Sequence, residues 1–310
     1  GYGEVFLVTK YIAGSGGPAN NTKVHKIRMA CKTVKLKEDS QARTVRRFDS
    51  LRAELYVLQS LSGQCPYVIE YFEHYILRYR PLTTNHSSEI ILQASIYMEY
   101  ADGGTMLEEV KTKGSLKRSL ARRYFTEMAT GLEFMHRNQI AHNDFKLDNV
   151  LLVKYRTEKG VTVKHCKLTD FGMAQFGWKD GVGLIYSKRH LGTRSYMAPE
   201  VLQFGLTDLM VRPAPYVPFK ADIWSLGISL YVMLTRQYPY EVPKNTEDPK
   251  YKKLLKRLKR TGGVLSKVEA IRIFGSIGLA RLLTGMLHYN PDKRFNIEVV
   301  TKQPWLKIRS

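Results

Sequence analysis

The first hundred residues alternate between short β-rich runs and one helical segment. Three runs rich in β-branched and aromatic residues have the pattern of strands, at 4–11, 28–36 and 90–100. Residues 45–61 instead carry apolar side chains at helical spacing. Glycine, proline, asparagine and serine gather at 14–21 and 80–88 and predict exposed connections there. We therefore expect this half to form a small sheet with one main helix.

Helical spacing dominates from residue 116 onward. Apolar residues recur every three or four positions along one predicted helix, at Leu120, Tyr124, Met128, Leu132 and Met135. The same spacing returns around Trp224, Leu254 and Leu282. The most apolar stretch, 224–235, is interrupted by serine and glycine and is too short to cross a bilayer, so it predicts a buried core helix and no membrane span. The second half is therefore expected to be mainly helical.

A hinge is predicted between the two halves. The segment from Ala101 to Gly104 reads ADGG, and its glycines allow backbone angles that other residues resist. We place the boundary here, between a unit of residues 1–101 and a larger unit of residues 102–310. The length of 310 residues suits either two core-bearing units or one large domain with two lobes.

Composition excludes several classes of protein. With 44% hydrophobic residues and 23 glycines, the chain is neither disordered nor collagen-like. Its 3 cysteines are far apart and form no CxxC pair or zinc spacing, which indicates reduced thiols and a cytoplasmic location. The 49 Lys and Arg residues outnumber the 28 Asp and Glu residues and leave a net charge of +21, which attracts anions without choosing among them.

The segment from Lys250 to Arg260 reads KYKKLLKRLKR and predicts a basic amphipathic helix. Its apolar residues share one stripe, and basic residues cover the other side. Such a helix suits an acidic membrane or calmodulin, but we favour a surface helix that is packed by its leucines and whose solvated charge steers acidic partners. Aromatic residues are spread along the chain rather than interleaved with a basic stripe, so nucleic-acid binding has no specific support.

The most informative segment for chemistry is HNDFKLDN, which places Asp144, Lys146 and Asn149 on one predicted loop. Two β-rich runs with a turn between them follow, at 150–155 and 161–168. Antiparallel pairing of these runs returns the chain to Asp170 in the triplet DFG, so Asn149 and Asp170 meet at the open end of the hairpin. One amide oxygen and one carboxylate side by side suit Mg²⁺, because this ion takes few protein ligands and fills its other coordination positions with phosphate oxygens and water.

These motifs resemble those of the eukaryotic protein kinase superfamily, and the resemblance covers nearly the whole chain in the right order. It implies an α+β fold with two lobes: a small antiparallel-sheet lobe with one main helix, and a larger, mainly helical lobe. It also implies transfer of the γ-phosphoryl group of ATP to protein substrates, with ATP and Mg²⁺ as cofactors. The pairing of Lys146 with Thr193 is typical of serine/threonine kinases. C-terminal runs such as PDKR are most similar to the calmodulin-dependent and AMP-activated group.

The resemblance implies a role for each residue of the reactive centre. Asp144 is expected to orient and deprotonate the acceptor hydroxyl, and Lys146 to offset charge on the phosphoryl group. Thr193 is expected to contact Asp144, and Asn149 and Asp170 to bind Mg²⁺. The alternative for Asp144 is a loop aspartate that caps a turn, but its neighbours in the motif favour the catalytic role.

Lys32, in the run MACK, corresponds to the lysine that holds the ATP phosphates in the family. Its expected partner is Glu54, which lies between Leu51 and Leu58 on the apolar face of its predicted helix. An ionised glutamate on a buried face is destabilising unless it is paired, so we favour this ion pair over a solvated helix glutamate.

The family also supplies the expected nucleotide site. Met98 would lie behind the adenine, the backbone of Glu99 and Ala101 would bind its edge, and other residues would cover its faces and the phosphates. The set is Gly3, Val5, Ala30, Lys32, Glu54, Met98, Glu99, Ala101 and Leu151. Gly3 and Val5 match only the last part of the Gly-rich loop GxGxxGxV, so we interpret the chain as a fragment that begins within this loop.

Other motifs imply structural roles. The run GTRSYMAPE, which ends at Glu200, resembles the end of an activation segment, and Glu200 is expected to pair with Arg294. Asp222, in DIWSLG, is expected to bind the backbone of the catalytic loop. His142 is interpreted as a packing residue rather than a base.

Asn143 departs from the family, in which an arginine usually precedes the catalytic aspartate and pairs with a phosphorylated activation segment. An amide lacks that bidentate grip, so we expect activity to depend little on phosphorylation of this segment. This segment runs from Asp170 to Glu200 and carries several residues expected in an exposed loop: Tyr186, Ser187, Lys188, Arg189 and His190.

Two other functions stay open from the sequence. A pseudokinase that acts as a nucleotide-binding scaffold is suggested by the incomplete Gly-rich loop and by Asn143, although every reactive group is retained. A basic docking module would use residues 250–260 to bind membranes or acidic proteins without turnover. Phosphoryl transfer from ATP distinguishes the enzyme from both.

Overall fold

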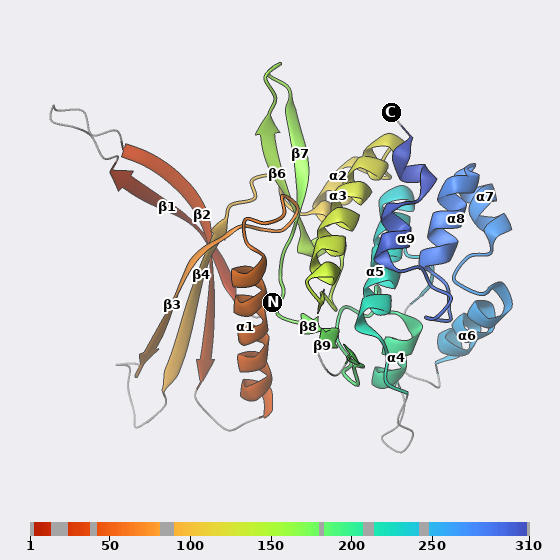
Figure 1. Ribbon diagram of the computed structural model, residues 1–310, viewed down its shortest axis with the longest axis horizontal. Helices are drawn as coiled ribbons and strands as arrows, with labels where there is room; N and C mark the ends of the chain where they lie inside the picture. Colours follow the sequence, from red (N-terminus) through yellow and green to blue (C-terminus); the bar gives the residue numbers. More distant parts are fainter. Residues whose placement is uncertain are drawn as a thin grey trace.

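The computed structural model describes residues 3–13, 24–37, 42–80, 90–179, 183–206, 214–241 and 248–308. The predicted connection at 14–21, nearly all of the one at 80–88, and the first two residues lie outside these ranges. Within them, a small lobe built on a sheet stands beside a larger lobe of helices (Figure 1). This is the two-lobed α+β architecture that the sequence predicts.

The small lobe consists of a four-stranded antiparallel sheet in the order β1-β2-β4-β3 and one helix, α1 (Ala42–Leu61). Its strands are β1 (Glu4–Ala13), β2 (Val24–Lys37), β3 (Tyr71–Tyr79) and β4 (Ile91–Glu99). Leu51 and Leu58 of α1 are buried, because the apolar stripe of the helix packs into the core. The predicted helix and three predicted strands are therefore confirmed.

Strand β3 is the element of the small lobe that the sequence pattern missed. Its sequence, YFEHYILRY, mixes apolar and charged residues without alternation, and its side chains are half-buried or exposed. The reason is its place at the edge of the sheet, where neither face imposes a strict apolar pattern.

A short linker, residues 100–105, leads from β4 into α2 (Met106–Lys113). The hydroxyl of Thr105 accepts a hydrogen bond from the Glu108 N–H at 3.1 Å, and the Glu108 carboxylate accepts one from the Thr105 N–H at 2.8 Å. This reciprocal cap fixes where the helix begins. The boundary proposed after residue 101 falls within the linker.

The larger lobe is mainly helical, as predicted. Its longer helices are α3 (Arg118–Arg137) and α5 (Pro218–Thr235), and the others are α2, α4 (Pro199–Leu206), α6 (Pro249–Thr261), α7 (Lys267–Phe274), α8 (Ile277–Met286) and α9 (Ile297–Thr301). Trp224, Leu226 and Leu230 of α5 are almost fully buried, which confirms the core helix. Across the described ranges, no helix combines the length and the apolar character that a bilayer span requires.

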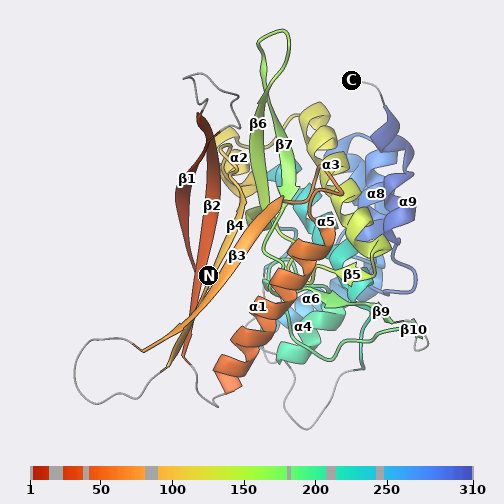
Figure 2. The ribbon, with the colours of Figure 1, turned by 60° about the vertical axis from the view of Figure 1, so that its left-hand side comes forward.

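The short strands of the larger lobe frame its loops. They are β5 (Ile140–Ala141), β6 (Val150–Arg156), β7 (Thr162–Leu168), β8 (Gln175–Phe176), β9 (Trp178–Lys179) and β10 (Gly183–Leu184), and 3₁₀ turns lie at Leu147–Asn149 and Pro304–Lys307. Strands β6 and β7 pair from Val150 opposite Leu168 to the turn, so the predicted hairpin is confirmed. It stands between the small sheet and the helices (Figure 2).

Candidate active site

The expected ion pair between Lys32 and Glu54 is present. Lys32 Nζ lies 2.6 Å and 2.8 Å from the two carboxylate oxygens of Glu54, and Glu54 is buried. Lys32 comes from β2 and Glu54 from α1, so this contact joins the helix to the centre of the sheet. A buried carboxylate without this partner would be strongly destabilising, and the solvated alternative for Glu54 is therefore wrong.

Lys32 also reaches across to the larger lobe. Its Nζ lies 3.1 Å from Asp170 Oδ1. Burial lowers the pKa of Lys32, but the charges of Glu54 and Asp170 outweigh it and raise the pKa above its ordinary value. Burial likewise acts to raise the pKa of Asp170, yet Lys32 holds it below its ordinary value. Lys32 stays an ammonium and Asp170 a carboxylate at neutral pH.

The backbone at Asp170 is held in an unusual conformation. Its φ of 61° lies in the left-handed region, which is uncommon for a residue with a side chain. The Thr169 N–H donates to the carbonyl of Asn149 at 3.1 Å, so the hairpin brings the two expected metal ligands to the same place. Local strain of this kind persists where the surrounding structure enforces it, commonly at functional sites.

The loop from His142 to Asn149, which is the expected catalytic loop, is held in place by Asp222 of α5. This buried carboxylate accepts hydrogen bonds from the backbone N–H groups of His142 and Asn143, both at 2.8 Å, and lies 2.9 Å from His136 Nε2. His142 is fully buried and packs against the ring of Phe171, 5.5 Å away. The structural roles predicted for Asp222 and His142 are confirmed.

Asp144, Lys146 and Thr193 form a closed triangle. Lys146 Nζ donates to Asp144 Oδ2 and to Thr193 Oγ1, both at 2.8 Å, and Thr193 Oγ1 donates to Asp144 Oδ1 at 2.9 Å. Gly192 makes this approach feasible, because its φ is 102° and a Cβ there would lie 2.6 Å from the carbonyl of Asn143. The activation segment thus contacts the expected general base directly.

The donor set around Asn149 suits Mg²⁺. Asn149 Nδ2 donates to the carbonyl of Asp144 at 2.9 Å, which turns the amide oxygen to the other side. Asp170 uses one carboxylate oxygen for Lys32, and its side chain is 47% exposed. One amide oxygen and one accessible carboxylate oxygen are hard ligands that leave places for phosphate and water.

Residues expected to line the nucleotide site share one face of the sheet. Val5 lies opposite Lys32, and Ala30 lies opposite Met98, with Ala30 two positions before Lys32. Directly opposite residues and residues two apart point to the same side of a sheet. Val5, Ala30, Lys32 and Met98 therefore face the same way, and Met98 is buried.

The end of β4 and the linker that follows it can offer backbone groups, rather than side chains, to a nucleotide. The carboxylate of Glu99 is 2.8 Å from Lys167 Nζ, which turns it aside. In the described part of the chain, neither the N–H nor the carbonyl of Ala101 has a hydrogen-bond partner. No local sequence pattern indicates the Glu99–Lys167 pair, because only the fold brings these residues together. Leu151 forms a β-bridge with Thr105 at the end of this linker, and Gly3 directly precedes β1.

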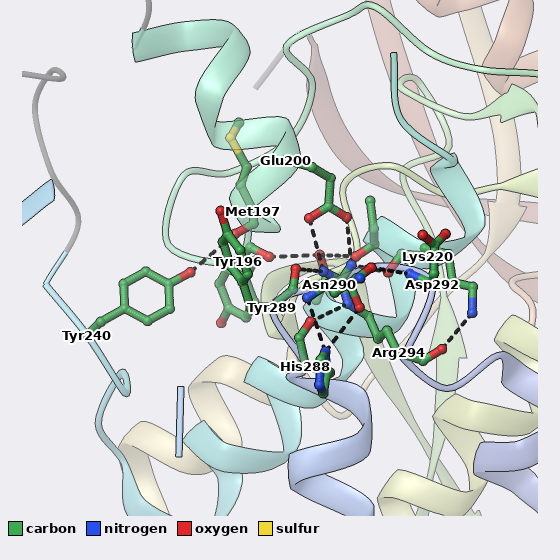
Figure 3. A network of polar contacts seen from close by, with 12 residues as sticks. Tyr196, Met197, Glu200, Lys220, Tyr240, His288, Tyr289, Asn290, Asp292 and Arg294 are labelled. Atoms are coloured by element: carbon green, nitrogen blue, oxygen red, sulfur yellow. Dashed lines mark hydrogen bonds and ion pairs between the residues drawn. The ribbon is translucent and has the colours of Figure 1, made fainter. Parts of the chain in front are cut away.

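The predicted pair between Glu200 and Arg294 forms the centre of a buried network (Figure 3). Arg294 donates to both carboxylate oxygens of Glu200, at 2.7 Å and 3.0 Å, to the carbonyl of Lys220 at 2.7 Å, and to that of His288 at 3.0 Å. Its side chain is fully shielded from solvent. The bidentate contact fastens the end of the activation segment to the body of the larger lobe.

One expectation for the activation segment is wrong. Ser187 is buried rather than exposed, because its backbone pairs with that of Tyr216 in both directions, at 2.8 Å and 3.0 Å. Tyr186 is 58% exposed, as expected. Asn143, at the position of the usual arginine, has a φ of 62° and donates from Nδ2 to the carbonyl of Met173 at 2.9 Å. A neutral hydrogen bond thus ties the catalytic loop to the segment after Asp170.

Phosphatase treatment is therefore expected to leave the rate of phosphoryl transfer within about twofold of its starting value, since Asn143 already fixes the segment without a charged partner. The measurement compares initial rates before and after treatment, with mass spectrometry to follow bound phosphate.

A large loss of activity after treatment would contradict this expectation. The phosphate group would then have a nearby basic cavity in which to bind. That cavity, of about 380 Å³, is lined by Arg46, Arg47, Arg189 and His190, among others. Burial and the charge of Arg194 lower the pKa of His190, so the positive charge of the cavity at neutral pH comes from its arginines.

The model of the protein kinase domain family matches residues 12–306. The chain is 34% identical over 212 residues to the serine/threonine-protein kinase SRK2F of Arabidopsis thaliana, covering 68% of this chain and 53% of that protein. It is 30% identical to SRK2C of the same plant, covering 83% and 69%, and 32% identical to ppk25 of Schizosaccharomyces pombe, covering 69% and 43%.

The chain belongs to the protein kinase domain family. Its relatives are named serine/threonine-protein kinases, which agrees with the type predicted from Lys146 and Thr193. The chain spans about half the length of several of the relatives it matches.

Proposed function

We propose that the chain is an ATP-dependent protein serine/threonine kinase. The observation that carries this proposal is the triangle of Asp144, Lys146 and Thr193, 2.8–2.9 Å on each side. A carboxylate held there can orient and deprotonate an acceptor hydroxyl, and the adjacent ammonium can offset charge on the phosphoryl group.

ATP and Mg²⁺ are the proposed cofactors. Lys32, fixed by Glu54, would grip the phosphates, and Asn149 and Asp170 would hold the metal, which bridges phosphate oxygens and neutralises their charge. Val5 and Ala30 would pack on one face of the adenine and Leu151 on the other, with Met98 behind the ring and the backbone of Glu99 and Ala101 at its edge. Gly3 would approach the phosphates.

The direct test is incubation of the chain with γ-labelled ATP, Mg²⁺ and generic protein substrates, followed by phosphoamino-acid analysis. Labelled phosphoserine and phosphothreonine are the expected products. Nucleotide binding without transfer would instead favour the pseudokinase, the alternative that the incomplete Gly-rich loop and Asn143 suggest.

An acidic partner is the finer proposal for the helix α6. Leu254 and Leu258 are buried, so the apolar stripe is already used by the core and is not free to enter a membrane or to be wrapped by calmodulin. Five basic residues of the helix are exposed, and none has an ion-pair partner among the described residues: Lys252, Lys253, Lys256, Lys259 and Arg260.

The helix also lies close to the end of the activation segment. Tyr240 donates to the carbonyl of Met197 at 3.2 Å, and the next residue, Glu241, pairs with Lys250 at the start of α6. Protein substrates with an acidic stretch beside the acceptor residue are therefore the partners that its charge favours.

Reversing two of these charges, in K252E/K256E, is expected to lower kcat/KM about tenfold for an acidic protein substrate and to leave a neutral peptide substrate unaffected. K302E, a reversal at the exposed residue that follows α9, serves as the control. Equal losses for both substrates would contradict the proposal, as would binding to phosphatidylserine vesicles but not to the acidic substrate.

The three cysteines are all buried free thiols, which supports the proposal of a reducing, cytoplasmic location.

A further inference from the structure

The two sides of the β6–β7 hairpin differ in character. Tyr155 lies directly opposite Val163, and the next pair inward joins Lys154 to Lys164. Directly opposite residues share a side of the sheet and successive residues alternate, so these two pairs point to opposite sides. One side, which we call the apolar face, consists of Val153, Tyr155, Thr157, Val161, Val163 and His165. The other side is basic and carries Lys154, Arg156 and Lys164.

The basic side is anchored to the larger lobe. Lys164 Nζ lies 2.7 Å from Glu109 Oε2 of α2. The Lys154 N–H donates to the carboxylate of Asp102 at 2.9 Å. The apolar face stays open, since Tyr155 is 43% exposed, and the hairpin projects beyond the helices at the top of Figure 2. An exposed apolar face of this kind is typical of a surface that meets a partner.

A cavity of about 400 Å³ lies against the apolar face. Its lining joins the hairpin to the connection between α1 and β3, through Pro66, Tyr67, Tyr155, Arg156, Thr157, Val163 and His165. The rings of Tyr155 and His165 meet edge to face, 5.2 Å between centroids. Among the described residues, the hydroxyls of Tyr67 and Tyr155 have no hydrogen-bond partner. The cavity therefore combines aromatic walls with two tyrosine hydroxyls that can still donate.

These features suit a segment in the polyproline II conformation. Such a segment makes no hydrogen bonds within itself, so its backbone carbonyls need donors from outside. Its proline rings pack on aromatic side chains, and grooves lined by tyrosine are the usual receptors for it. Pro66, Tyr67 and Tyr155 offer both the apolar surface for the rings and the donors for the carbonyls.

Charge indicates which proline-rich segments fit. Lys154, Arg156 and Lys159 are exposed, and none of them has an ion-pair partner among the described residues. No acidic residue belongs to the described lining of the cavity. Glu127, the carboxylate nearest to His165, is buried and already accepts from the Cys166 N–H at 2.8 Å. The field at the cavity therefore favours acidic residues beside the prolines.

We propose that this cavity binds a proline-rich segment of a partner protein that carries acidic residues beside its prolines. Two prolines of the segment pack on Tyr67 and Tyr155, backbone carbonyls accept from the two hydroxyls, and a carboxylate faces Arg156. Recognition of the segment as a polyproline II helix keeps the entropy loss of binding small, because this conformation exists before binding.

The hairpin is also ordered before binding. Its turn is closed by the Thr157 N–H, which donates to the carbonyl of Val161 at 2.9 Å, and by the Val161 N–H, which donates to Thr157 Oγ1 at 3.1 Å. The Arg123 guanidinium of α3 donates to the carbonyl of Lys164 at 3.0 Å and holds the base of the hairpin. Both partners therefore meet with little rearrangement.

The test uses a fluorescein-labelled peptide, EPPLPPEE, and two control peptides. EAALAAEE keeps the charges but loses the prolines, and KPPLPPKK keeps the prolines but reverses the charges. Fluorescence anisotropy with the full chain, in the absence of nucleotide, is expected to give micromolar affinity for EPPLPPEE. Each control peptide is expected to bind at least tenfold more weakly, because it lacks either the rings or the carboxylates.

Variants locate the site. Y155A and R156E are each expected to weaken binding of EPPLPPEE at least tenfold. Y56A is the matched control for Y155A, since Tyr56 is 49% exposed and its ring meets that of Phe176 edge to face, also at 5.2 Å. R52E, at an exposed arginine of α1, is the control for R156E. Both control variants are expected to bind the peptide as the unmodified chain does.

Circular dichroism checks that each variant is folded, and R156E carries the test if Y155A is not, because Arg156 is exposed at the end of its strand. Equal affinity for EPPLPPEE and either control peptide would overturn the proposal, as would equal losses in Y155A and Y56A. A chain that forms dimers in sedimentation, and monomers in the Y155A variant, would also overturn it, because a second copy would then cover the apolar face. Since the binding assay contains no nucleotide, its result is independent of whether the chain transfers phosphate.

Discussion

Asp144→Asn lowers kcat by about 100-fold to 10,000-fold, the range expected when a general base is lost. The substitution keeps the size of the side chain, and the amide oxygen can still accept from Lys146 Nζ, while the amide N–H₂ faces the hydroxyl of Thr193, which can turn to accept from it. What disappears is the negative charge that accepts the proton of the substrate hydroxyl. The measurement is steady-state phosphoryl transfer to a protein substrate, together with nucleotide affinity by calorimetry.

The matched control for this experiment is Asp148→Asn. Asp148 lies on the same loop four residues later, but it is exposed and takes no part in the triangle. Its variant is expected to retain nearly the full rate. If Asp144→Asn also kept a near-normal kcat, or if both variants lost activity equally, Asp144 would not be the base.

Arg294→Met lowers the free energy of unfolding by about 3–5 kcal/mol, because it leaves the Glu200 carboxylate in the interior without its partner. Methionine fills much of the same volume but replaces none of the four donor contacts that Arg294 makes to Glu200, Lys220 and His288. Urea unfolding followed by circular dichroism measures the change.

Arg294→Lys is expected to recover only part of this loss. A lysine carries the charge but lacks the planar fork that reaches both oxygens of Glu200 and two carbonyl groups together. Arg281→Met, an exposed position on α8, is the control and is expected to change stability by less than about 0.5 kcal/mol. Equal stability of the Arg294→Met and Arg281→Met variants would show that the buried network has no such role.

Much of the site could be predicted because its chemistry is concentrated in short, ordered motifs. Asp144, Lys146 and Asn149 lie within one loop, and a short hairpin is enough to bring Asp170 to them. Glu54 could be identified because a carboxylate on an apolar helix stripe demands a cation. The helices α3 and α5 followed from strong apolar periodicity in segments long enough to carry it.

The remainder depended on tertiary contacts that no local pattern encodes. Strand β3 is an edge strand without alternation, and Ser187 is buried only because Tyr216, far along the chain, pairs with its backbone. The side chain of Glu99 is turned aside by Lys167, and the bond from Asn143 to the Met173 carbonyl depends on a left-handed backbone. Each of these contacts joins positions whose proximity only the folded chain determines.

The central claim is that Lys32, Asp144, Asn149 and Asp170 gather around one nucleotide and its metal. Crystals of the chain grown with Mn²⁺ and a non-hydrolysable ATP analogue test it most directly, because the anomalous signal of manganese locates the ion independently of the chain. We expect a peak within bonding distance of Asn149 Oδ1 and the Asp170 carboxylate, with Lys32 on the phosphates and Asp144 facing the γ-phosphoryl group. A nucleotide bound elsewhere, or metal held by other residues, would contradict the account.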